Sequence, residues 1–167
     1  MAVPQGSKKA VDKEFERLME IREIKRHPEA LIFLKKAWAS LGSKNLLELR
    51  GPMKRSLIHY AAMGDCSELI RYLLLSNASV DERDRNKRTP LSWAAEYASL
   101  DSVKILLLNG AKINSIDDMY STPLTWLLQA GPPNDQCART ESYLISKGAK
   151  EKGAKRRWVV KKLHFLF

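Results

Sequence analysis

A chain of 167 residues with 44% hydrophobic side chains is long enough to bury the core of one domain. Its longest aliphatic run, residues 105–108, is too short to cross a bilayer, and the first residues lack the apolar stretch of a signal peptide, so membrane-spanning and secreted proteins are disfavoured. The net charge of +10 is uneven, because residues 150–167 hold seven basic residues and one acidic residue and so carry +6. Cys66 and Cys137 have no metal-binding or redox spacing, which favours a reduced cytoplasmic or nuclear setting.

The first part of the chain is predicted to be a helical cap that follows a disordered start at residues 1–9. Residues 10–26 place apolar side chains at near-helical spacing, and Pro28 can open a second helix that ends at Gly42. Residues 43–50 are compatible with the outer helix of a shortened repeat unit. We therefore expect residues 10–50 to cover one end of the structure, with these apolar side chains at helical spacing: Val11, Phe15, Leu18, Met19, Ile24, Leu31, Leu34, Trp38 and Leu41.

A pattern of ten residues then occurs three times at a step of 33 residues, and its middle copy, RTPLSWAAEY, starts at residue 88. The segments between the copies match as well, since Leu73 aligns with Leu106 and Val80 with Ile113, which indicates a true repeat. The third copy carries five extra residues. They are expected in the turn-like segment 131–137, where two prolines exclude continuous helix. The other copies are RSLIHYAAMG from residue 55 and STPLTWLLQA from residue 121.

Each copy is predicted to contain two helices and a hairpin. Thr89 can cap the first helix, and Pro90 suits its first turn because the N–H at that position would be unpaired anyway. A second helix over residues 101–109 is too densely apolar for a solvated helix, and it ends at Gly110, which tolerates a left-handed backbone. Residues 112–121 have no helical period and are expected to form the hairpin. Because neither helix can bury its apolar face alone, neighbouring units are expected to stack.

The repeated pattern resembles the ankyrin repeat, whose Thr-Pro-Leu-His-x-Ala-Ala signature and period it shares over about residues 50–150. The middle copy matches best, with Ser92 in place of histidine. The first copy lacks the proline but keeps His59, and the third has Leu127 and Leu128 in place of the two alanines. The resemblance implies an all-α fold, an ankyrin-repeat solenoid of stacked helix-turn-helix units with hairpin loops, flanked by N- and C-terminal helical segments. The expected repeat units are residues 51–83, 84–116 and 117–150.

The C-terminal segment, residues 151–167, is basic and amphipathic. Three interpretations stay open for it: a helix that caps the third repeat, a nuclear-import or nucleic-acid patch, and a helix on an anionic membrane surface with Trp158 and Phe165 as anchors. Its basic clusters are formed by Lys155, Arg156, Arg157, Lys161 and Lys162.

The sequence contains no pattern typical of a catalytic or metal site. His59 stands in the repeat signature at a helix start, where the resemblance implies a structural hydrogen bond. Asp117 and Asp118 suit a turn, and both cysteines are expected to be inert. We therefore expect no enzymatic activity, no cofactor or metal ion and no small-molecule substrate. One repeat position is aromatic in all three copies, which indicates a stacked aromatic row in the core: Tyr60, Trp93 and Trp126.

Without a catalytic site, function is expected to come from the surface. The resemblance implies that a partner protein binds the concave face, so that the chain acts as an adaptor or scaffold in the cytoplasm, the nucleus or both. Basic residues at 83–88 favour an acidic partner. The alternative is association with nucleic acid or an anionic membrane through the basic tail. The resemblance assigns these positions to the concave face: Lys54, Met63, Arg85, Asn86, Arg88, Glu96, Tyr97, Asp118, Met119, Ser121 and Gln129.

Overall fold

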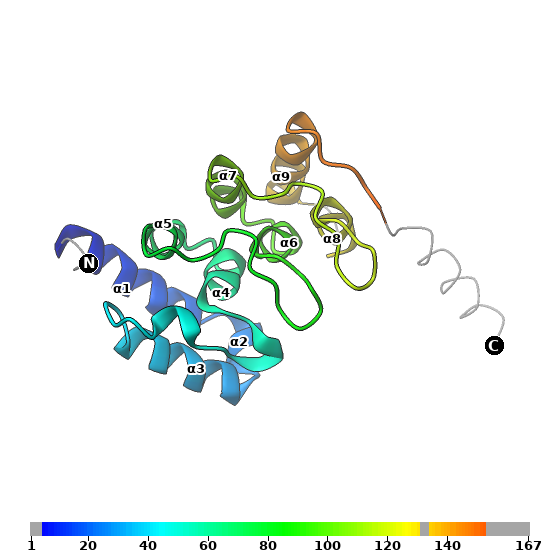
Figure 1. Ribbon diagram of the computed structural model, residues 1–167. Coiled ribbons are helices and arrows are strands. Elements are labelled where there is room, and N and C mark those ends of the chain that lie inside the picture. Colours follow the sequence, from blue (N-terminus) through cyan, green and yellow to red (C-terminus); the bar gives the residue numbers. More distant parts are fainter. Residues whose placement is uncertain (1–4, 131–133, 153–167) are drawn as a thin grey trace, which may run out of the picture.

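The structure is a computed structural model that describes residues 5–130 and 134–152, and over these residues it consists of helices, turns and loops without a strand. The helices form two layers (Figure 1). In the inner layer α4 (Leu57–Met63), α6 (Pro90–Glu96) and α8 (Pro123–Gln129) lie side by side. The outer layer holds α5 (Ser67–Leu75), α7 (Leu100–Leu108) and α9 (Asp135–Ser146). The predicted all-α solenoid of stacked helix pairs is therefore confirmed.

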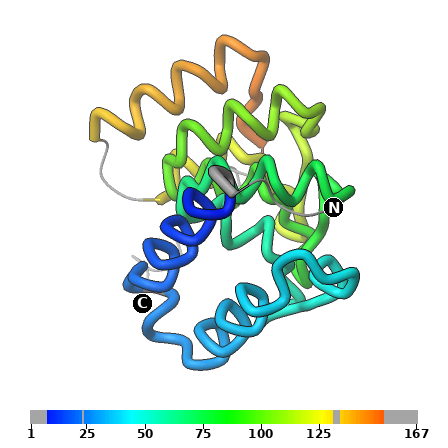
Figure 2. The backbone as a smooth tube through the Cα atoms, turned by 90° about the vertical axis from the view of Figure 1, so that its left-hand side faces the viewer, coloured from blue at the N-terminus to red at the C-terminus, as the bar shows by residue number. Residues whose placement is uncertain are grey.

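The N-terminal helices cover one end of this stack, as Figure 2 shows, and α9 lies at the other end. α1 (Gln5–Met19) packs beside α5, so it extends the outer layer. α2 (Arg22–Lys25) and α3 (Pro28–Ala39) follow, and α3 packs on α1. Two short 3-10 turns, η1 (Leu46–Glu48) and η2 (Pro52–Lys54), lead into α4. The core is continuous from these helices into the stack through fully buried side chains such as Phe15, Leu34, Leu69 and Leu106.

The N-terminal region differs from the prediction in three places. Residues 5–9 are helical instead of disordered, because they are the first turns of α1 and extending an existing helix costs little. The helix expected over residues 10–26 is interrupted at Ile21, whose extended backbone separates α1 from α2. Residues 46–48 form only a short 3-10 turn, whereas residues 43–50 were compatible with the outer helix of a shortened repeat.

The predicted insertion at residues 131–137 is described only in part. Residues 131–133 lie outside the described residues, as does the tail from residue 153 onward. Residues 135–137 are the first turn of α9 and not part of a loop. This turn is helical because Asn134 caps it, with its Oδ1 accepting the backbone N–H of Cys137 at 2.9 Å.

The inner helices start where the Thr-Pro pairs predict. Thr89 Oγ1 accepts the N–H of Ser92 at 3.3 Å, and Thr122 Oγ1 accepts the N–H of Thr125 at 3.4 Å. In both helices a proline occupies the first helical position. Each second helix of a pair ends with a left-handed residue at Asn77, Gly110 or Gly148, and the end predicted at Gly110 is confirmed.

Two of the outer helices, α5 and α7, receive hydrogen bonds at their starts from the preceding part of the stack. Glu14 of α1 accepts the N–H of Leu69 at 2.6 Å, at the start of α5. In the same way Asp65, which follows α4, accepts the N–H of Ser102 at 2.7 Å, at the start of α7. These carboxylates satisfy donors that a helix leaves free, so α5 and α7 are each held by a polar contact with the preceding element as well as by apolar packing.

Small side chains set the spacing of the inner layer. Ala61, Ala62, Ala94 and Ala95 are fully buried between α4 and α6, which lets the two helices approach closely. Among the described residues, no helix has the length and hydropathy needed to span a bilayer.

Candidate functional site

Aromatic rings and arginine guanidinium groups alternate in a column along the inner layer. The Arg88 Cζ atom lies 3.6 Å from the ring centre of Trp93 and 3.9 Å from that of Trp126. The Arg55 Cζ atom lies 4.2 Å from the same Trp93 ring. The predicted direct stack of aromatic rings is therefore wrong for Trp93 and Trp126, because the negative faces of the two indoles attract a cation and Arg88 fills the space between them.

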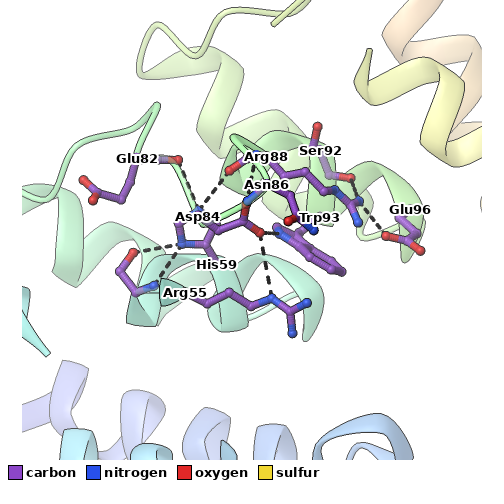
Figure 3. A network of polar contacts seen from close by, with 10 residues as sticks. Arg55, His59, Glu82, Asp84, Asn86, Arg88, Ser92, Trp93 and Glu96 are labelled. Atoms are coloured by element: carbon purple, nitrogen blue, oxygen red, sulfur yellow. Dashed lines mark hydrogen bonds and ion pairs between the residues drawn. The ribbon is translucent and has the colours of Figure 1, made fainter. Parts of the chain in front are cut away.

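Two buried aspartates fix the geometry of the column, and Figure 3 shows the first of them, Asp84. Asp84 Oδ1 accepts the backbone N–H groups of Asn86 at 2.9 Å and Arg88 at 3.0 Å, and its Oδ2 accepts the Trp93 indole N–H at 3.0 Å. Asp117 Oδ2 accepts the Trp126 indole N–H at 2.7 Å in the same way. Each carboxylate thus ties its hairpin to the next inner helix. Asp117 also accepts two hairpin N–H groups, so its predicted role in a turn is confirmed.

Arg88 has a structural role that the sequence-based assignment missed. Only 5% of its side chain is exposed, and its guanidinium donates to Glu96 at 2.5 Å and to the carbonyl oxygen of Ser92 at 3.3 Å. Burial lowers the pKa of Arg88, while the charge of Glu96 opposes this effect. Its expected exposure on the concave face is wrong. Met63 and Ser121 are also less exposed than expected, at 6% and 4%, although Met63 still reaches the wall of the cavity described below.

The other predicted positions are at least partly accessible. Glu96, Tyr97 and Gln129 are partly buried near the ends of α6 and α8. Successive hairpins are joined at their tips, since the N–H of Arg85 donates to the carbonyl oxygen of Met53 at 2.8 Å and the N–H of Asp118 to that of Asn86 at 3.1 Å. We call this row of tips the hairpin edge. Its exposed predicted residues are Lys54, Arg85, Asn86, Asp118 and Met119.

A cavity of about 750 Å³ lies between the N-terminal helices and the inner layer. Of the predicted residues it brings together Met63, Glu96 and Tyr97. The hairpin edge borders it, because Met53 belongs to both. The rest of the wall was not predicted, although the repeat step of 33 residues aligns Arg55 with Arg88 and so indicates that Arg55 has an equivalent place. The other lining residues are Ile24, His27, Ala30, Pro52, Met53, Arg55, Tyr60, Trp93 and Ala130.

His59 links the first inner helix to the following hairpin. Its Nδ1 accepts the N–H of Ser56 at 3.1 Å, so Nε2 carries the proton and donates to the carbonyl oxygens of Glu82 at 3.1 Å and Arg88 at 3.3 Å. The structural hydrogen bond predicted for His59 is confirmed. Burial lowers the pKa of His59, and the nearby charge of Asp84 opposes that shift.

Because of His59, the free energy of unfolding is expected to decrease as the pH is lowered. The unfolded histidine titrates near pH 6.5, above the folded pKa, so its contribution is complete above that pH and is lost as the pH falls below it. We expect a lower urea midpoint at pH 5.5 than at pH 7.5. The variant His59→Gln, which has no titrating ring, should show a smaller difference. Equal differences in both proteins would contradict the assignment, and the comparison cancels the pH dependence of Glu14, whose pKa burial raises.

Cys66 is buried between the first inner and outer helices, and burial raises the pKa of its thiol to about 11. Almost none of it is thiolate at neutral pH, which agrees with the predicted inert role. Cys137 is partly buried in the first turn of α9 and is also a free thiol.

Comparison with known proteins supports the repeat assignment. A family model described as "Ankyrin repeats (3 copies)" matches residues 24–117. This match runs from α2 to the hairpin before α8, so it begins upstream of the predicted 50–150, and the predicted unit boundaries stay predictions. A search of curated proteins finds no match to the chain. The repeat step, the paired helices and the family match together show that the chain belongs to the ankyrin repeat family, whose members generally mediate protein–protein interaction and are typically not enzymes.

Proposed function

We propose that the protein is a non-enzymatic adaptor or scaffold that binds a partner protein through its concave face, the face formed by the hairpin edge and the inner helices. The observation that carries the proposal is the cavity of about 750 Å³, which combines apolar walls with the exposed hairpin edge. A buried apolar centre with a polar rim is the usual composition of a protein-binding site.

The architecture supports a preformed site. The cavity walls come from helices whose packing faces are buried, and the hairpins that border it are joined by backbone hydrogen bonds. Such a surface loses little conformational entropy when a partner binds. The rim charge is partly neutralised within the protein, since Lys87 pairs with Asp118 at 2.9 Å. The exposed side chain of Arg85 makes no ion pair with the described residues, so it is available to a partner.

The proposal predicts that Arg85→Glu weakens partner capture without loss of stability. Affinity capture from an extract, followed by mass spectrometry, should show proteins that bind the wild-type chain and are lost with Arg85→Glu, since the reversed charge repels an acidic partner. The matched control is Arg71→Glu on α5, an exposed arginine of the outer layer. Equal capture by both variants would contradict binding at the concave face.

A chain that ends at Lys152 separates this proposal from association through the basic tail. Capture at the concave face should survive the truncation when the melting temperature is unchanged. Binding that disappears with the tail and falls steeply with salt would instead favour nucleic acid or an anionic membrane.

A further inference from the structure

Arg55 and Arg88 hold equivalent places in successive repeats but have different partners. Both precede an inner helix, and both guanidinium groups lie against the Trp93 ring. Arg88 is neutralised by Glu96, eight residues later. The residue eight positions after Arg55 is Met63, which cannot supply a carboxylate. The first repeat therefore contains the cation of this pair without its anion.

The nearest carboxylate does not replace the missing one. Arg55 Nε lies 3.9 Å from Asp84 Oδ2, beyond hydrogen-bond distance, and that oxygen already accepts the Trp93 indole N–H. Nε is buried and makes no hydrogen bond, whereas 23% of the Arg55 side chain is exposed, and it lines the cavity. The charge of Arg55 is thus only weakly compensated within the protein, so a carboxylate that enters the cavity and reaches the exposed part of this side chain would be stabilised.

A second polar group at the cavity wall, the Tyr60 hydroxyl, lies beside the Arg55 guanidinium and has no carboxylate partner. Tyr60 is 1% exposed and its hydroxyl makes no hydrogen bond of normal geometry. It occupies the repeat position of Trp93 and Trp126, whose N–H groups donate to Asp84 and Asp117. The residue equivalent to Asp84, 33 positions earlier, is Gly51, which has no carboxylate. A Cβ atom at Gly51 would lie 2.9 Å from the Tyr60 hydroxyl oxygen. This repeat therefore has no equivalent of Asp84 or Glu96, the two carboxylates near the arginine of the next repeat.

We propose that the cavity binds an acidic peptide segment of the partner, with an aspartate or glutamate side chain paired to Arg55 as Glu96 is paired to Arg88. The inference rests on the proposed function and names the chemistry of the partner. Met53, Met63 and Ile24 provide an apolar wall for a hydrophobic residue beside the acid. Charge complementarity favours this occupant, because Glu96 is already neutralised by Arg88, whereas Arg55 has only the long ion pair with Asp84 at 3.9 Å.

The test compares two nearly isosteric substitutions, Met63→Glu and Met63→Gln. Glutamate at this position should pair with Arg55 and block the cavity, whereas glutamine has the same size without the charge. A phage-displayed library of random peptides is selected on the full wild-type chain, and enriched peptides are synthesised. We expect them to contain an acidic residue whose change to the amide weakens binding to the wild type about tenfold or more. Met63→Glu should weaken binding similarly, and Met63→Gln should bind nearly as the wild type does.

Arg55→Met completes the cycle, because the peptide and its amide form should bind this variant equally weakly. Enriched peptides without an acidic residue, equal binding to Met63→Glu and Met63→Gln, or a selection that enriches no peptide would overturn the inference. The proposed function has a separate outcome. Peptides that need no carboxylate but lose affinity with Arg85→Glu would support binding at the concave face while contradicting the role of Arg55. If Arg55→Met does not fold, the two Met63 variants still decide the question.

Discussion

Arg88→Glu is expected to lower the free energy of unfolding by about 3–5 kcal/mol or more, which is enough to unfold many domains of this size. The substitution removes the cation between the Trp93 and Trp126 rings. It also places a new carboxylate in a buried space that already contains Asp84 and lies next to Glu96. Loss of helical circular dichroism, or a large fall in the urea midpoint, measures the effect.

Arg85→Glu is the matched control, because it makes the same chemical change three residues earlier in the same hairpin. Arg85 is exposed, so its substitution should change the free energy of unfolding by less than about 0.5 kcal/mol. The sequence alone assigns both arginines to one basic concave surface. It therefore predicts that reversing the charge of both leaves stability nearly unchanged. A stable Arg88→Glu protein would show that the buried column contributes little to the fold.

Leu106→Ala is the second substitution with a large expected effect. Leu106 is fully buried in α7, which contacts α6 and both neighbouring outer helices, so a cavity should form and cost about 2–5 kcal/mol. Leu108→Ala, two residues later in the same helix, removes a side chain that is 84% exposed and should cost less than about 0.5 kcal/mol. Chemical denaturation of both variants measures the difference. Similar losses would contradict the packing of the outer layer.

The regular part of the fold could be predicted because its signals are local and repeated. Thr89 and Thr122 each precede a proline, and this pair marks a helix start within a few residues. Gly110 marks a helix end by the same kind of local rule. The constant step then showed that the helix pairs must stack. A regular stack of this kind needs no further long-range information.

The site was harder to predict because its residues come together from distant parts of the chain. Arg88 looks like a surface residue in any short window, and its burial depends on Trp126, which lies 38 residues later in sequence. The cavity depends on Ile24 and Ala30, which belong to helices before the strictly spaced copies. The repeat register did contain one usable signal. It aligns Arg55 with Arg88 and Met63 with Glu96, so the missing carboxylate can be read once the Arg88–Glu96 pair is known.

The position of Arg88 between rings of two successive repeats has a consequence for how the stack comes apart. Repeat proteins can fray from an end, one unit at a time, when each unit is held mainly by its own contacts. Here the unfolding of α8 would remove the Trp126 ring from one face of the Arg88 guanidinium and leave Arg88 in contact with Trp93 alone of these two rings. The second and third units therefore share a penalty for separating, and this couples their melting into one cooperative step.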